Sequence, residues 1–247
     1  MRSQATYYGA NGWLLEIDGL RVLVDPWLCG SLVFPPGSWF LKGVLPQQFP
    51  IPSQLDLLLL TQGLPDHAHP ETLKELPKSL PVVGSESAGR VTKRLGFETV
   101  TQLRPGDCKE FKGLKIRATA GAAVPNIENG YLLFWSTGSL YLEPHGVLDP
   151  EIESRKVDTL ITPTVDLGLP LLGAFITGAT VMPDLVNRFQ PQTILASTTG
   201  GDVEFSGAIS HILKAEGTTA APEEIPKTCS LITPQVGKPI PLPKGSN

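Results

Sequence analysis

The feature that most constrains the fold is an uninterrupted apolar run, Leu57–Leu60, set between polar neighbours. A short continuous apolar run of this kind is typical of a strand that is buried on both faces. After it, segments 72–76 and 87–95 are predicted to be short helices, and 81–84 is predicted to be another strand. This alternation of strands and helices predicts a layered α/β domain in which helices cover a sheet.

Pairs of strands are expected on both sides of that region. Segments 12–17 and 20–25 flank Asp18-Gly19, and an Asp-Gly turn between two β-prone runs is a strong hairpin signal. Further strands are expected at 108–111, 114–119, 130–135, 139–143, 159–162 and 193–196, and further helices at 181–188 and 205–214. We expect one domain over residues 1–237 and an extended C-terminal tail over residues 238–247.

Residues 27–49 are expected to form a long loop that is rich in aromatic side chains, among them Phe34, Trp39 and Phe40. In one interpretation these side chains pack beneath the loop. In the other, Leu32–Leu41 form an exposed apolar lip that contacts an apolar ligand, a membrane surface or a partner protein. Periodicity does not decide between the two interpretations, so both stay open.

The charge balance argues against nucleic-acid binding. The 247 residues include 20 basic and 24 acidic side chains, which gives a formal net charge of -4, and no run of Lys or Arg occurs. Nucleic-acid binding depends on a basic surface, which this composition does not predict. The Gly-rich phosphate-binding motifs and the G-x-S-x-G motif of serine hydrolases are also missing from the sequence.

The cysteines and the apolar stretches exclude further classes. Cys29, Cys108 and Cys229 are far apart in the sequence, so neither a disulfide framework nor a thiolate zinc site is expected. Unpaired thiols and an N-terminus without an apolar core predict a cytoplasmic protein. The longest apolar stretch, 167–182, is interrupted by Gly and Pro and is too short for a transmembrane span.

Three of the four histidines fall in two short polar clusters, each directly after a predicted strand. The first cluster, residues 61–69, contains Asp66, His67 and His69. Polar groups just beyond strand ends often bind ligands, and Asp beside His supplies two types of metal ligand. In the alternative interpretation Asp66 only caps the following helix and the histidines are solvated. The fourth histidine, His211, lies in the last predicted helix and is expected to be structural or on the surface.

The second cluster consists of Glu143 and His145, at the end of the predicted strand 139–143. It again places a carboxylate next to an imidazole at a strand terminus. Because both clusters follow strands, we expect them to converge on one site.

At this point the sequence resembles the metallo-β-lactamase superfamily over roughly residues 5 to 235. The first hairpin and its terminal Asp25-Pro26, and the strand that leads into Asp66-His67, are similar to the family's first hairpin and its T-H-x-H-x-D-H motif. The stretches TQGLPDHAH, ENGYLL and SLYLEPHG resemble a branch found in cyanobacteria and plant plastids. The resemblance implies a four-layer αββα sandwich with its site at one edge of the two sheets.

Several of the family's metal ligands are replaced in this sequence. Gln62 and Leu64 occupy the first two His positions of the motif, and Ala122 stands where the next ligand His is expected. No His lies near residues 197–200, where the last one is expected, and residues 143–145 occupy the region of the bridging Asp. The resemblance therefore implies the fold without its usual two-metal hydrolytic site.

Two functional interpretations follow. The first is a non-catalytic or binding protein that uses the fold alone, with a small molecule, a protein or a membrane surface at Leu32–Leu41 as partner. The alternative is a mononuclear metal-dependent hydrolase with a rearranged site. In it, Asp66, His67, Glu143 and His145 are the metal ligands, Glu143 and His145 also act as catalytic groups, and His69 is a substitute ligand or supports the others. Such ligands suit one divalent zinc, iron or manganese ion.

Overall fold

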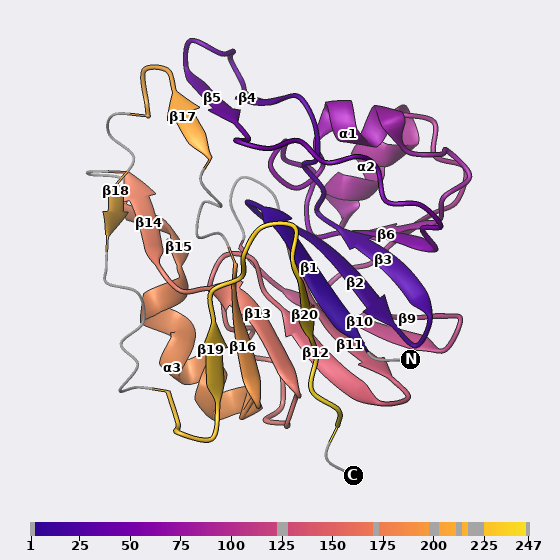
Figure 1. The fold of residues 1–247 in the computed structure, drawn as a ribbon, viewed down its shortest axis with the longest axis vertical. Helices are drawn as coiled ribbons and strands as arrows, with labels where there is room; N and C mark the ends of the chain where they lie inside the picture. The colour runs from indigo at the N-terminus through magenta and orange to yellow at the C-terminus, as the bar shows by residue number, and fades with distance from the viewer. Residues whose placement is uncertain are drawn as a thin grey trace.

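The computed structural model describes residues 3–122, 128–169, 173–197, 203–210, 214–216 and 225–245. Two seven-stranded sheets pack face to face and enclose the largest hydrophobic core (Figure 1). In spatial order, the first sheet contains β20 (Pro239–Pro241), β1 (Gln4–Gly9), β2 (Gly12–Ile17), β3 (Leu20–Val24), β6 (Leu57–Leu60), β7 (Val82–Gly84) and β8 (Val100–Gln102). The second contains β19 (Ser230–Ile232), β16 (Thr193–Ser197), β13 (Thr159–Pro163), β12 (Gly138–Leu142), β11 (Asn129–Trp135), β10 (Leu114–Ala120) and β9 (Cys108–Phe111).

Strand β6 shows why a run of leucines forms a strand here. Leu57 and Leu59 belong to the core between the sheets, whereas Leu58 and Leu60 belong to the apolar cluster under the helices. Because successive side chains of a strand point to opposite faces, all four leucines are buried. β6 runs parallel to both β3 and β7, so the loops after β3 and β6 begin at the same end of the strands.

Helices cover the outer face of each sheet. Helices α1 (Pro70–Glu75) and α2 (Glu86–Arg94) lie on the first sheet, where Leu73 and Ala88 pack among the side chains of β2, β3 and β6. Helix α3 (Gly178–Phe189) lies on the second sheet, with Met182, Leu185 and Phe189 in its core. The predicted four-layer αββα sandwich and the α/β class are therefore confirmed.

Two small sheets flank the sandwich. One consists of β15 (Gly173–Thr177), β14 (Asp166–Leu169) and β18 (Lys214–Glu216), and the other of β17 (Glu204–Ser206), β5 (Leu41–Val44) and β4 (Ser31–Phe34). The prediction that residues 27–49 form a loop is therefore wrong in part, because β4 and β5 form a hairpin within this segment. The predicted helix 205–214 is wrong too: residues 204–206 pair with β5, and residue 214 begins β18. His211 lies outside the described residues.

The aromatic segment is buried at the base of this hairpin and exposed at its turn, and its contact with a ligand or partner stays a prediction. At its base, Trp27, Leu32 and Leu45 form a small buried cluster. At its turn, Trp39 is 66% exposed.

The C-terminal segment reaches back to the start of the chain. β20 pairs with β1, so residues 239–241 form an edge of the first sheet. Among the described residues, no helix combines the length and apolar character needed to cross a membrane.

Candidate metal centre

The site lies where the ends of strands from both large sheets meet. Asp25 directly follows β3, the segment Thr61–His67 follows β6, and Glu143 follows β12. Glu128 directly precedes β11, which pairs with β12. The Asn129 backbone N–H donates to the Thr61 carbonyl at 3.0 Å, and this bond joins the two sheets beside the site.

His67 is fully buried and both of its ring nitrogens have polar neighbours. Its Nδ1 lies 2.9 Å from Oδ2 of Asp25 and 2.8 Å from Oγ1 of Thr61. Thr61 also donates its backbone N–H to Oδ1 of Asp25 at 2.8 Å. These bonds hold the carboxylate against Nδ1, so Nε2 points to the other side. The Nε2 atom lies 3.3 Å from Oδ2 of Asp66 and 3.2 Å from the amide nitrogen of Asn11.

His145 makes a second pair of the same kind, because its Nδ1 lies 2.6 Å from Oε2 of Glu128. The other carboxylate oxygen of Glu128 accepts from the Gln62 side chain at 3.1 Å. The rings of His67 and His145 are 5.1 Å apart between centroids. Asp66, His67 and His145 each offer a ligand atom, and these atoms all lie within 4.8 Å of one another. The structure therefore brings three of the four predicted metal ligands together.

The fourth, Glu143, stands apart from that group of three. Its Oε2 accepts from the backbone N–H groups of His145, at 3.1 Å, and of Gly146. Glu143 thus fixes the turn that carries His145. Gly146 has a φ of +77°, and a Cβ at this position would lie 2.6 Å from the backbone of Gly178, so the turn requires glycine.

His69 has a structural place outside the group. Its side chain accepts the backbone N–H of Thr72 and so caps α1, and its Nε2 lies 3.2 Å from the carbonyl of Ser31. The alternative in which Asp66 caps this helix is therefore wrong, because His69 is the cap.

Burial and neighbouring charges shift the pKa values of the site. Burial alone would lower the pKa of His67, but the carboxylates of Asp66 and Asp25 outweigh it and hold that pKa well above the usual value. The pKa of His145 is raised in the same way, because Glu128 outweighs the effect of burial. Burial, with the charge of Glu128 beside it, raises the pKa of Glu143 to about 7.

The donor set fits a divalent metal ion. A carboxylate and two imidazoles are common ligands of such ions, and metal-bound histidines usually place their other ring nitrogen against a carboxylate. Asp25 and Glu128 occupy that position behind His67 and His145. As metal ligands the two imidazoles would be neutral, so the charge of a dication would be balanced by the carboxylates beside them, among them Asp66 and Asp25.

Four residues of the site are not expected there from the sequence: Asp25, Asn11, Gln62 and Glu128. Asp25 had a visible signal, since it precedes Pro26 at the end of the predicted strand 20–25, and β3 runs parallel to the strand before His67. Glu128 lies in the stretch ENGYLL but is distant in sequence from both clusters, and only the packing of the two sheets places it beside His145.

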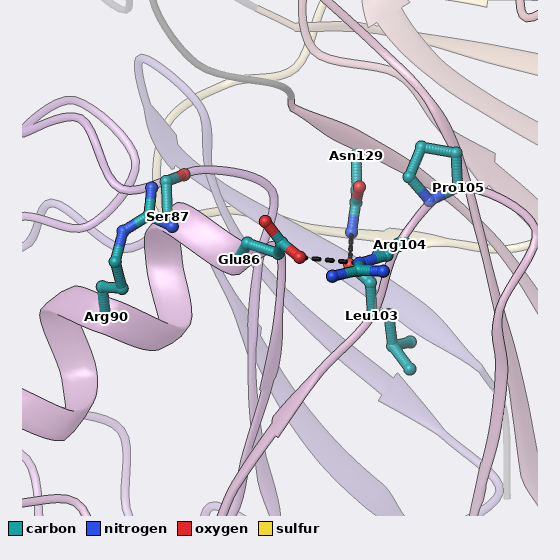
Figure 2. Close-up of a pocket in the computed structure, with 7 residues that line it drawn as sticks. All are labelled: Glu86, Ser87, Arg90, Leu103, Arg104, Pro105 and Asn129. Atoms are coloured by element: carbon teal, nitrogen blue, oxygen red, sulfur yellow. Dashed lines mark hydrogen bonds and ion pairs between the residues drawn. The ribbon is translucent and has the colours of Figure 1, made fainter.

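Two pockets lie outside this group. One, of about 460 Å³, lies between α2 and the segment after β8, where Arg104 and Glu86 form an ion pair of 2.7 Å (Figure 2). Asn129, the neighbour of Glu128, lines its wall. A second pocket, of about 560 Å³, includes Cys29, Phe49 and Glu71. Neither lining includes Asp66, His67 or His145.

Comparison with known proteins identifies the family. A family model described as "Beta-lactamase superfamily domain" matches residues 4–197, so the chain belongs to the beta-lactamase superfamily. No curated protein matches the chain significantly.

Solved structures share the fold at low sequence identity. A structure described as a possible metal-dependent hydrolase from Veillonella parvula DSM 2008 is 17% identical with a TM-score of 0.70, over 98% of this chain and 100% of that one. Isothiocyanate hydrolase from Delia radicum gut bacteria is 16% identical with a TM-score of 0.69, over 96% and 98%. CmlA, a diiron beta-hydroxylase from Streptomyces venezuelae, is 17% identical with a TM-score of 0.65, over 98% of this chain and 54% of that one.

Proposed function

We propose that this protein binds one divalent metal ion through Asp66, His67 and His145 and is a mononuclear metal-dependent hydrolase. The observation that carries the proposal is the pairing of each imidazole with a carboxylate, Asp25 behind His67 and Glu128 behind His145. Such pairing fixes the orientation of a ligand histidine and raises its basicity. The similarity to hydrolases of the same fold supports the reaction class by analogy.

A single metal ion is proposed because the positions of the other ligands hold different side chains. Leu64 and Ala122 carry no ligand atom, and Gln62 donates its amide N–H to Glu128. The remaining donors, one carboxylate and two imidazoles, suit zinc, iron or manganese, with open positions for water or substrate.

The residues of this chain then have separate tasks. The metal ion, when bound, lowers the pKa of a coordinated water and polarises the bond to be hydrolysed. Asp25 and Glu128 orient the two imidazoles. Glu143 holds the turn of His145 through Oε2, while its Oε1 is buried and has no hydrogen-bond partner among the described residues. We propose that Oε1 binds and releases a proton near neutral pH, as a general acid or base.

The first experiment measures metal content by elemental analysis of untagged protein, purified without added metal and again after incubation with zinc, iron or manganese. We expect about one metal ion per chain, lost in His67→Ala and in His145→Ala. His69→Asn is the matched control, because it replaces a buried histidine outside the group and keeps a capping side chain. Metal in the double variant His67→Ala/His145→Ala at the wild-type level would overturn the assignment.

Hydrolysis is tested next, with chromogenic esters, lactones, amides and phosphodiesters. We expect turnover that a chelator abolishes and the added metal restores.

A non-catalytic binding protein is the second candidate, and the burial of the group favours it. His67 is fully buried, and the side chains of His145 and Asp66 are only 11% and 20% exposed. In this case the metal would be retained, but no substrate of the panel would be hydrolysed. Absence of metal under all conditions would exclude the hydrolase and leave binding by the fold alone.

A further inference from the structure

The most unusual surface of the protein is the sheet formed by β4, β5 and β17, here called the flap sheet. Among the described residues the exposed large hydrophobic side chains are Val33, Trp39, Val44 and Phe205. All four belong to the flap sheet or to the turn between β4 and β5. Figure 1 shows these strands projecting at the top of the molecule, beyond the ends of the two large sheets.

The flap sheet is packed at its base and held by backbone hydrogen bonds at its turn. Leu32 of β4 packs against the buried Trp27, and a Cβ on Gly43 would lie only 3.0 Å from the Trp27 ring. At the turn, the backbone carbonyl of Trp39 accepts from the N–H of Ala208 at 2.8 Å, while the indole of Trp39 stays 66% exposed. The backbone is thus held in place while the aromatic side chain faces solvent.

The apolar side chains of the flap sheet point in several directions. Val44 pairs with Glu204, and in the adjacent pair Gly43 lies opposite Phe205. Because successive pairs face opposite sides of a sheet, Val44 and Phe205 lie on opposite faces. Both residues lie at the end of the strands away from the turn, and the exposed large apolar side chain of the turn itself is Trp39. A single exposed indole fits a membrane interface, which needs no complementary apolar face.

The charge distribution agrees with contact to lipid. Between Asp25 and Asp56 the chain carries one charged residue, Lys42, although 18% of the whole chain is charged. In an antiparallel hairpin, Lys42 stands near the turn, opposite Val33. The one carboxylate of the flap sheet, Glu204, pairs with Val44 at the end away from the turn. No acidic side chain of the turn would therefore have to enter the headgroup layer.

We propose that the turn of the flap sheet, residues 35–40, inserts into the surface of a lipid bilayer, with the Trp39 indole at the level of the headgroups. Tryptophan is enriched at this level because its ring is apolar and its N–H remains able to donate. Lys42 lies within reach of the phosphate groups. The proposal is independent of the metal centre, since none of its residues belongs to that group.

The experiment uses sedimentation of the full-length protein with vesicles of phosphatidylcholine and of an equimolar mixture of phosphatidylcholine and phosphatidylglycerol. We expect the wild type to bind both, and Trp39→Ser to lower the partition coefficient about tenfold, since a large apolar contact is removed. Trp39→Phe should retain most of the binding. Lys109→Ser on the exposed strand β9 is the control for a surface change elsewhere and should bind like the wild type.

Fluorescence gives a second readout that does not depend on folding defects in a variant. Of the four tryptophans, Trp13, Trp27 and Trp135 are at most 8% exposed, so brominated phosphatidylcholine should quench mainly Trp39 in the wild type. Absence of both sedimentation and quenching would overturn the proposal. So would a Trp39-dependent dimer in size-exclusion chromatography without vesicle binding, which would assign the flap sheet to contact with a second copy.

Discussion

Nδ1 of His67 lies 2.9 Å from Oδ2 of Asp25, and this contact links the end of β3 to the loop after β6. Asp25 itself has a φ of 39°, a left-handed conformation that Asp and Asn adopt more readily than most residues. The backbone thus turns sharply at the strand end and points a carboxylate at the imidazole. This geometry leaves Nε2 of His67 directed toward Asp66.

The first prediction concerns Asp25→Asn. Asparagine fits the same backbone conformation and still accepts from Thr61, so the protein should fold. The lost negative charge weakens the orientation of His67, and metal affinity is expected to fall by about 10- to 100-fold. Competition with a chelating dye measures the change. Asp56→Asn, which removes a surface carboxylate paired with Lys112, is the control and should leave the affinity unchanged.

The second prediction concerns the pH dependence of metal binding. Because Asp66 and Asp25 hold the pKa of His67 well above 6.5, a proton occupies the imidazole at neutral pH and must leave when metal binds. The apparent dissociation constant should therefore fall as pH rises from 6 toward the raised pKa, by up to about tenfold per pH unit for each proton released. Isothermal titration calorimetry in buffers of different ionisation enthalpy would count the protons. A pH-independent affinity contradicts the assignment of His67 as a ligand.

Much of the fold was predictable because it depends on local patterns. The run Leu57–Leu60 and the Asp18-Gly19 turn each determine a strand through side-chain alternation or turn geometry, and both lie where expected. The segment 205–214 was misassigned because residues 204–206 pair with β5, which is distant in sequence. Such pairing overrides a local helical preference.

The site was predictable only in part. Asp66, His67 and His145 follow strands, and the rule that strand ends meet at a sheet edge brings them into one region. Glu128 enters the site because one sheet packs on the other, whereas Asn11 lies in the β1–β2 turn of the same sheet as the strand before His67. The distances between these side chains and the imidazoles depend on the tertiary structure. No spacing along the chain encodes them.

The third prediction tests how tightly the loop after β6 is held. A Cβ on Gly63 would lie 2.7 Å from the carbonyl oxygen of Ser87 and 2.8 Å from its carbonyl carbon. Because these are backbone atoms of α2, relief requires the loop or the helix to move, and Gly63→Ala should destabilise the protein by about 1–3 kcal/mol. Urea unfolding measures this change. Gly245→Ala, whose Cβ would meet no atom closer than 3.4 Å, is the control and should be near neutral.

The fourth prediction uses Glu143→Gln in metal-free protein. The pKa of Glu143 is about 7 in the folded protein, compared with an ordinary value of 4.5. Between these values the folded state holds a proton that the unfolded state has released, so wild-type stability should decline as pH rises from 4.5 through 7. The titration of Glu143 should lower the free energy of unfolding by roughly 3 kcal/mol over this pH range.

Glutamine keeps an acceptor for the N–H groups of His145 and Gly146 but cannot ionise, so the variant should lack this part of the decline. Urea unfolding at a series of pH values, in the presence of a chelator, measures how the free energy of unfolding depends on pH. Glu110→Gln on the exposed strand β9 is the control. His67 and His145 also lose their stabilising protons as pH rises, but above their ordinary value of 6.5. Burial also raises the pKa of Asp25, so that carboxyl group contributes a decline to both proteins, and the difference between the two curves from pH 4.5 to 6.5 is what reports on Glu143. Parallel curves for wild type and variant there would show that the carboxyl group of Glu143 is ionised in the folded protein.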